Sequence, residues 1–311
     1  MGVLEQNTLV GLKHSDASKW FFGGFSPMLN VKFRGFNNIA RNIPRILIHI
    51  LLIAGSIITI FPMAWMFLSA FKPPQEIIQI PPNLFPSEPT LDNFKELFSD
   101  LPFMRFILNS LLVTTASTVI LIFLTSLAGF VFAKFEFVGK KVMYAIILMT
   151  MMIADEVLVL PLYLMIARAH LNNTYLALIM PFLITGFAVF LMRQFISTIP
   201  NELIEAAIID GAGYFRIYWV IILPLIGPAI ASLAIFNFVW MWNMFMWPTV
   251  ALDTEIMMTI PVALSRFTSM YLTRYDLTMA AASVSTIPIL IAFLILQRNF
   301  IRGIALTGLK Q

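Results

Sequence analysis

Two adjacent carboxylic acids, Asp155 and Glu156, lie inside a long apolar run. They are about 20 Å from Lys141 along a helix, at a rise of about 1.5 Å per residue. A charged side chain is costly in the hydrocarbon of a bilayer, so such acids should face a bundle interior or a wet path. They could contact a polar solute, couple its movement to an ion gradient, or form a structural hydrogen bond to a neighbouring subunit. The residues alone leave these roles open.

A second group surrounds Asn243, near the end of another apolar run. An asparagine in an apolar helix must hydrogen-bond to protein, substrate or water, while tryptophan faces can stack on the C–H groups of a sugar. An aromatic belt at the membrane interface, with an asparagine bridging two helices, explains the same residues. Asn243 and Trp242, in a segment that also contains Trp240 and Trp247, are therefore candidates for a substrate path, with a structural role as the alternative.

A third group occupies a short polar segment: Glu205-Ala206-Ala207, then Gly211, then Ile221 and Leu223-Pro224. Pro200 suits a first helical turn, acids near it complement the helix dipole, and Gly211 should end the helix. The spacing predicts that one face carries Ile204, Ala207 and Ile208, while Glu202 and Glu205 point elsewhere. That apolar face needs a partner, either another protein or the headgroups of a membrane.

Enzymatic chemistry is poorly supported. The chain has no cysteine, which excludes a thiol nucleophile or a thiolate metal site. No Gly-Lys-Ser/Thr phosphate loop occurs, and His14, His49 and His170 are too scattered for a helical zinc motif. We therefore expect no catalytic residue and no metal site in this chain.

Composition indicates a polytopic membrane protein. Of the 311 residues, 59% are hydrophobic and 12% are charged, and the mean hydropathy is +0.88. The net charge of +4 does not indicate a nucleic-acid partner, because the basic residues are scattered around apolar runs instead of forming one stripe.

Six apolar runs are long enough to cross a bilayer, and each should be a helix because lipid cannot satisfy unpaired backbone groups. The expected fold is all-α, with six transmembrane helices and a short polar helix between the fourth and fifth. The expected spans lie near Ile46–Phe71, Phe106–Ala133, Val142–Ala167, Tyr175–Phe195, Ile217–Trp247 and Met279–Leu296.

Most of the 20 lysines and arginines lie in the N-terminal segment, the second and fourth connections and the tail. The positive-inside rule therefore predicts that both termini and the polar segment 197–216 are cytoplasmic. The expected organisation is an N-terminal cytoplasmic extension (1–43), a transmembrane domain (44–303) and a cytoplasmic tail (304–311).

The third group resembles the cytoplasmic signature loop of permease subunits in bacterial ATP-binding-cassette importers. Its full spacing is E-A-A, three residues, G, nine residues and then I-x-L-P. This resemblance implies that the loop docks on an ATPase subunit. The coupling residues would be Ile204, Glu205, Ala206, Ala207, Ile208, Asp210 and Gly211.

Further motifs resemble carbohydrate importers of the maltose and glycerol-phosphate type, specifically the second permease of the pair. These are Asn109-Ser110, Trp242-Asn243 with Pro248, and the ending QRNFIRGIALTGLK. Ala154 stands where the family has a proline two residues before Glu156, so the usual cause of a helix kink is missing there. Pro161 is the alternative position for a kink. By position, the connection from Leu252 to Asp276 matches a loop that reaches the external binding protein in maltose-type relatives.

The resemblance implies that the chain carries a sugar by alternating access. It implies a second homologous permease, two ATPase subunits that bind ATP and Mg²⁺, and an extracytoplasmic sugar-binding protein, all at a bacterial cytoplasmic membrane. An ion-coupled secondary transporter using Asp155 and Glu156 is the main alternative, although it leaves the E-A-A spacing unexplained. An importer permease for a solute other than a sugar and a non-transporting scaffold are further alternatives.

The charge distribution makes a topology prediction. A reporter fused after Lys141 or Gln311 should be cytoplasmic, and one inserted near Ser87 or Thr268 should be external, because Lys and Arg concentrate on the cytoplasmic side. Paired alkaline phosphatase and fluorescent-protein fusions measure each position. A single reversed site would contradict the six-span topology.

Overall fold

The chain folds as helices joined by short connections in the computed structural model, which describes residues 36–270 and 274–308. Side chains are described for residues 47–265 and 274–297. No strand occurs within these described ranges. The expected all-α, polytopic membrane fold is confirmed. Most of the predicted extension 1–43 and the end of the tail lie outside the described residues.

The chain divides into two compact units, Met1–Thr59 and Ile60–Gln311. The described part of the first unit is the beginning of α1 (Phe36–Ser69), a helix that continues into the second unit. From Leu47 to Thr59 its side chains are exposed, and most of them are apolar. A helix whose exposed surface is mostly apolar on all sides suits contact with lipid or with another protein.

Two long helices in the second unit are continuous: α4 (Phe103–Lys134) and α15 (Tyr275–Gly308). The third, fourth and fifth expected spans are each broken. Among the residues that the structure describes, three helices are long and apolar enough to cross a membrane, or up to six spans are present if each bent pair is one span. Each predicted apolar run contains helix, and the three bent pairs correspond to the third, fourth and fifth predicted spans.

The third span breaks between α5 (Lys140–Thr150) and α6 (Asp155–Arg168), which are bent by 102°. Ala154 adopts an extended conformation just before α6, so the break forms without a proline at this position. Pro161 lies inside α6 and does not end it. The expected alternative, a kink at Pro161, is thus replaced by a sharper break at the start of α6.

The fourth span consists of α7 (Tyr175–Ile179), a short 3₁₀ turn (Met180–Phe182) and α8 (Gly186–Ser197), with a 50° bend. The hydroxyl of Thr185 accepts a hydrogen bond from the amide of Ala188 and caps α8. The fifth span begins with α10 (Tyr214–Ile217), a π-helical turn (Tyr218–Ile222) and α11 (Leu223–Leu225). It then bends by 76° into α12 (Gly227–Trp242).

Helix α4 packs most extensively against α8 and α12, and α12 also packs against α15. Gly129 permits the α4–α8 contact, because a Cβ there would lie 2.7 Å from Cβ of Met192 and 2.8 Å from the backbone nitrogen of Arg193. Hydrogen bonds between side chains join α4 to the fifth span: Asn237 of α12 donates to Thr118 (2.9 Å), and Ser126 pairs with the hydroxyl of Tyr218 in the π-helical turn (2.8 Å). Small residues and interhelical hydrogen bonds are typical of helix packing in membranes.

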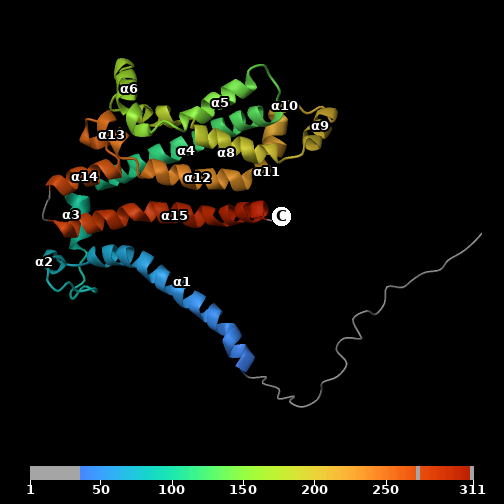
Figure 1. Ribbon diagram of the computed structural model, residues 1–311. Helices are drawn as coiled ribbons and strands as arrows, with labels where there is room; N and C mark the ends of the chain where they lie inside the picture. Colours follow the sequence, from blue (N-terminus) through green and yellow to red (C-terminus); the bar gives the residue numbers. More distant parts are fainter. Residues whose placement is uncertain (1–35, 271–273, 309–311) are drawn as a thin grey trace, which may run out of the picture. The chain divides into compact units, whose positions relative to one another are not determined.

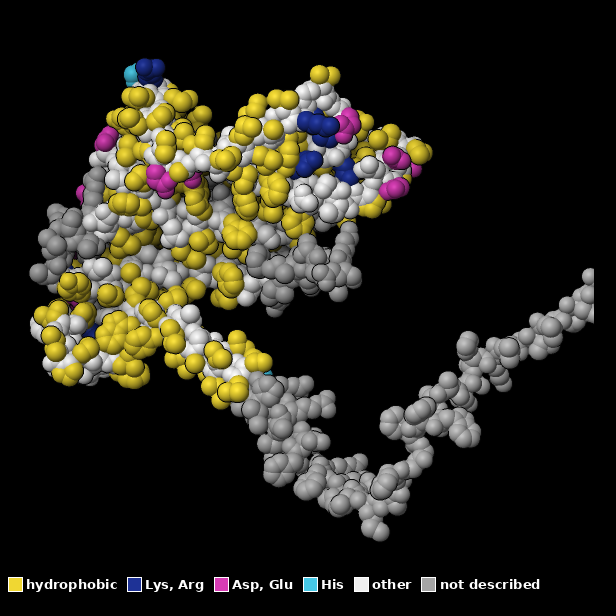
Figure 2. All heavy atoms as spheres, viewed as in Figure 1, with side chains coloured by type: hydrophobic (Ala, Val, Ile, Leu, Met, Phe, Trp, Pro, Cys, Tyr) yellow, Lys and Arg dark blue, Asp and Glu magenta, His cyan; other side chains and the backbone are white. Residues whose placement is uncertain are grey.

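Short elements cover the two ends of the second unit (Figure 1). One end, the α9 end, carries α9 (Asn201–Ile209) and the connection that follows α4. The opposite end, the α14 end, carries α3 (Asp92–Asp100), α13 (Met246–Ala251), a 3₁₀ turn (Glu255–Met257) and α14 (Ile260–Met270). Figure 2 shows hydrophobic side chains over much of the visible surface between these ends.

The α4–α8 contact predicts a stability effect. Gly129→Ala should lower the free energy of unfolding by about 1–3 kcal/mol, because a new methyl group meets backbone atoms that cannot move cheaply. Gly227→Ala is the control, since a Cβ there meets nothing within 4 Å. Thermal unfolding of the detergent-solubilised chain measures both. Equal midpoints for the two variants would contradict a close-packed contact at Gly129.

Candidate functional site

The E-A-A segment forms the short helix α9, and Gly211 ends it as predicted. Gly211 has a φ of 81°, in the left-handed region that favours glycine. Its amide donates to the carbonyl of Ile208 and the amide of Ala212 donates to that of Ala207, both at 2.9 Å. This pair of hydrogen bonds is a Schellman motif, which satisfies carbonyl groups at the helix end and turns the chain back toward α10.

The face of α9 that the sequence analysis assigned to a partner is used mainly inside this chain. Ile204 and Ala207 are each 8% exposed and pack in a core cluster with Ile199, Ile217 and Tyr218. Ile208 is the only one of the three predicted apolar residues that is exposed. The remaining exposed face of α9 carries Glu202, Leu203, Glu205, Ala206 and Ile209, with Asp210 and Gly211 beyond it. Ile209 is 85% exposed, so an apolar side chain projects from a face that also carries two glutamates.

Lys134, the last residue of α4, holds the entry to α9. Its ammonium group donates to the carbonyl of Ile199 and, at 2.8 Å, to the side-chain oxygen of Asn201. The exit is held by aromatic contacts: the Phe135 ring lies 4.8 Å from the Tyr214 ring, and Phe130 lies 6.1 Å from Tyr218. The segment on both sides of α9 is therefore attached to one end of α4.

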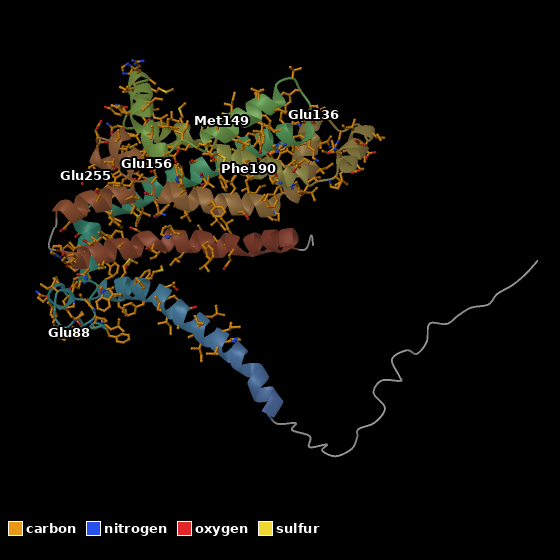
Figure 3. All side chains as sticks on the ribbon, viewed as in Figure 1. Glu88, Glu136, Met149, Glu156, Phe190 and Glu255 are labelled. Atoms are coloured by element: carbon orange, nitrogen blue, oxygen red, sulfur yellow. The ribbon has the colours of Figure 1, made fainter. Side chains whose placement is uncertain are left out.

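Asp155 and Glu156 lie in the first turn of α6, at the break in the third span, and both side chains are exposed in this chain. A helix N-terminus is a favourable position for carboxylates because of the helix dipole. Figure 3 shows Glu156 between Glu136 at the α9 end and Glu255 at the α14 end. The break exposes both acids, and their position in the middle of a membrane stays a prediction.

The two candidates from the fifth span have different environments. Trp242 is 3% exposed, stacks on Phe238 with ring centroids 5.8 Å apart, and donates its ring N–H to the carbonyl of Ser285 at 3.2 Å. It therefore connects α12 to α15, and it offers no open face to a solute. Asn243 is exposed and ends α12, where its side-chain amide donates to the carbonyl of Val239 at 2.8 Å.

Asn109 and Ser110, at the other end of α4, hold the connection between α13 and α14. The side-chain amide of Asn109 donates to the carbonyls of Ile256 (2.8 Å) and Met258 (2.9 Å), and its oxygen accepts from the hydroxyl of Tyr175. The hydroxyl of Ser110 accepts from the amide of Ile260 at 2.8 Å. These contacts explain the motif that the sequence shows only as Asn-Ser near the start of the second span.

Asn173 supports the same connection from the other side. Its side-chain oxygen accepts from the backbone amides of Asp253 (2.6 Å) and Thr254 (3.0 Å). Glu255 and Ile256 are left exposed at the tip. The beginning of the predicted loop Leu252–Asp276 is therefore an ordered projection, while residues 271–273 lie outside the described residues.

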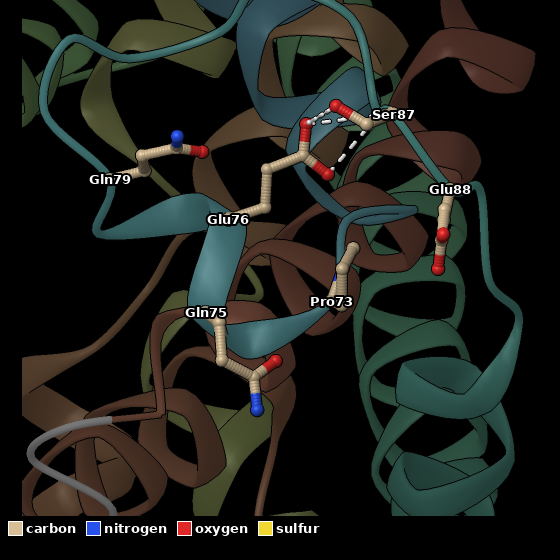
Figure 4. Close-up of a pocket in the computed structure, with 6 residues that line it drawn as sticks. All are labelled: Pro73, Gln75, Glu76, Gln79, Ser87 and Glu88. Atoms are coloured by element: carbon tan, nitrogen blue, oxygen red, sulfur yellow. Dashed lines mark hydrogen bonds between the residues drawn. The ribbon is translucent and has the colours of Figure 1, made fainter.

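The connection between α1 and α3 is also ordered at the α14 end. Glu76 accepts hydrogen bonds from the amide (2.9 Å) and hydroxyl (3.0 Å) of Ser87, which draws the chain around an open hollow of about 350 Å³ (Figure 4). Gln75, Gln79 and Glu88 also line this hollow. Arg274 pairs with Asp276 and Glu96, each at 2.8 Å, and these carboxylates raise the pKa of Arg274. α3 is thereby linked to the start of α15.

Sequence reasoning missed the contacts of Lys134, Asn109 and Asn173. Lys134 was treated only as a topology signal, and Asn109 only as part of a resemblance. Their partners lie 65 to 149 residues away along the chain, so residue spacing carries no trace of them. The one available signal was their type: long or amide side chains at helix ends commonly satisfy backbone carbonyl groups.

Comparisons with known proteins agree with this arrangement. Residues 122–306 match the family described as "Binding-protein-dependent transport system inner membrane component". The arabinooligosaccharide transport permease AraQ of Halalkalibacterium halodurans is 34% identical over 256 residues, covering 81% of this chain and 92% of that protein. The sn-glycerol-3-phosphate transport permease UgpE of Yersinia pestis is 32% identical over 264 residues, covering 82% and 94% respectively.

A crystal structure of a bacterial transporter that imports the acidic polysaccharide alginate shares the fold. One of its chains matches with a TM-score of 0.75 at 21% identity, covering 88% of this chain and all of that chain. The family model covers more than half of the 311 residues, and the relatives align over nearly their full lengths. The chain therefore belongs to the family of inner-membrane components of binding-protein-dependent transport systems.

Proposed function

We propose that this chain is a permease subunit of an ATP-binding-cassette importer that carries a sugar across the bacterial cytoplasmic membrane. One observation carries the proposal: the complete E-A-A spacing forms a short, capped helix at the end of the bundle where Lys134, Lys140 and Lys141 also lie. The family assignment favours this function over an ion-coupled secondary transporter.

The exposed face of α9 is the surface that we assign to an ATPase partner. Glu202, Glu205 and Asp210 give it negative charge, and Ile209 gives it an apolar projection. Protein interfaces typically have an apolar residue that becomes buried when the partner binds, with polar contacts around it. Two ATPase subunits would bind ATP and Mg²⁺ and close around this loop and its counterpart on a second permease.

A second homologous permease is proposed to cover part of the apolar surface formed by α5 and α6. Met143, Ile146, Met149, Met152 and Val157 are all exposed there. Lipid would cover the rest. Both termini and the α9 end would be cytoplasmic, and the α14 end would face the external sugar-binding protein.

The substrate is proposed to be a sugar, such as an oligosaccharide or a sugar derivative. The relatives described above are named for the transport of arabinooligosaccharides and of sn-glycerol-3-phosphate. Asp155 and Glu156 remain as path residues because they are exposed at the break in the third span, and Asn243 remains because it is exposed at the end of α12. Trp242 is omitted from the path because it is buried between helices. UgpE also supports a second candidate, a permease for a phosphorylated polyol that is not a sugar.

The proposed coupling loop is tested by Glu205→Ala combined with Gly211→Pro. Proline fixes φ near −65° and removes the amide that donates to Ile208, so the turn after α9 cannot keep its conformation. We expect ATP-dependent uptake to be lost while the chain still inserts and assembles. Uptake of labelled sugar per assembled complex is the measurement.

Gly213→Ala is the matched control for this experiment. Gly213 has a φ of −71° and open space around it, so alanine should leave uptake unchanged. Uptake by the double variant at the wild-type rate, with its ATPase present, would remove α9 from the coupling mechanism.

The proposed path acids are tested by Asp155→Asn and Glu156→Gln. Each change keeps volume and hydrogen bonding while removing a charge that is expensive inside a membrane. We expect the initial uptake rate or the range of sugars to change while the yield of complex stays constant. If yield or thermal stability changes instead, the acids form a structural contact with the second permease. Unchanged values in both measurements would exclude both roles.

A further inference from the structure

Helix α4 holds two loops that lie at opposite ends of the second unit. At the α9 end, Lys134 donates to Ile199 and Asn201, immediately before and at the start of α9. At the α14 end, Asn109 and Ser110 hold residues 256–260 through three hydrogen bonds of 2.8 to 2.9 Å. Figure 1 shows the two ends separated by the length of the bundle.

The helix between these contacts is unbroken. Lys134 and Asn109 are separated by roughly 37 Å at a rise of 1.5 Å per residue. No proline, glycine pair or π-bulge interrupts this stretch, and these are the usual causes of a kink. The third, fourth and fifth spans are all bent in their described residues, so α4 is the stiffest connection between these two loops.

The contacts at the two ends are specific and difficult to replace. Lys134 uses a charge-assisted donor, which forms stronger hydrogen bonds than a neutral group. Asn109 is 1% exposed, and both of its amide contacts go to backbone carbonyls of the same loop. A displacement of either loop must therefore move α4 or break these hydrogen bonds, which are part-buried or exposed at Lys134 and buried or part-buried at Asn109 and Ser110.

We propose that Lys134 and Asn109 are positioning residues that link the α9 loop to the loop at residues 256–260 through α4. A partner that displaces α9 would shift the conformational equilibrium of the opposite loop, and binding at that loop would act on α9 by the same coupling free energy. This inference rests on the proposed function, because it takes the partner at α9 to be an ATPase.

The experiment uses the absence of cysteine from the chain. Glu255→Cys places a single thiol at the exposed tip of the loop, where a fluorophore can report its environment in the assembled complex. The non-hydrolysable nucleotide AMP-PNP with Mg²⁺ is then added to the ATPase side. In the otherwise unchanged complex we expect the fluorescence to change. Lys134→Met should reduce that change by roughly threefold or more, within the range for residues that modulate coupling.

Matched variants separate coupling from folding. Lys134→Arg keeps a cationic donor and should restore the signal, while Lys141→Met removes an exposed lysine from the start of α5 and should leave the signal unchanged. Asn109→Ala removes the contacts at the other end and should reduce the signal as Lys134→Met does. If Lys134→Met fails to assemble, Asn201→Ala removes the side-chain acceptor on the α9 side and should weaken the response.

The outcomes distinguish this inference from the proposed function. Two results would overturn the role of α4 in a complex that transports sugar. One is a full fluorescence response to nucleotide in the Lys134→Met variant, and the other is no fluorescence response in the complex with Lys134 unchanged. A complex that shows no ATP-dependent uptake at all overturns the proposed function and this inference with it. Equal nucleotide binding by all variants, measured in parallel, shows that the ATPase subunits are intact.

Discussion

The side-chain amide of Asn109 donates to two backbone carbonyls of the loop before α14, and the ammonium group of Lys134 donates to a backbone carbonyl before α9. Both interactions satisfy backbone carbonyl groups in a connection at one end of the bundle, and a buried carbonyl without a partner is costly. The continuous helix α4 supplies the missing donors at both of its ends, and it also pairs with Asn237 and Tyr218 between them. The broken spans depend on it.

The breaks in the other spans serve to expose residues that a continuous helix would bury or leave in lipid. At the α5–α6 break, a 102° bend places two carboxylates in the first turn of a new helix. At the end of α12, Asn243 satisfies the Val239 carbonyl with its own side chain and remains exposed. In transporters, irregular backbone is tolerated where it is buried in protein or lines a cavity, which is the physical reason for assigning these residues to the path.

Helix α9 packs against this chain with one face and leaves its other face exposed. Its most apolar face, with Ile204 and Ala207, anchors it to the core of this chain, and this anchoring fixes the direction of the opposite face. Without the apolar residues on its inner face, α9 would have no packing contact to fix its position relative to α4. The proposed coupling role of the α9 loop is consistent with a helix that is packed on one face and exposed on the other.

The sequence by itself determined the membrane class, the helical fold, the position and end of α9, and the family resemblance, because hydropathy, glycine placement and motif spacing are local properties. Only the tertiary structure decided that Trp242 joins α12 to α15, that Ile204 and Ala207 face inward, and that the third span breaks at Ala154 without a proline. The contacts of Lys134, Asn109 and Asn173 also required it. Each joins residues far apart in the chain, and such pairing depends on how helices pack, which spacing along a single sequence does not encode.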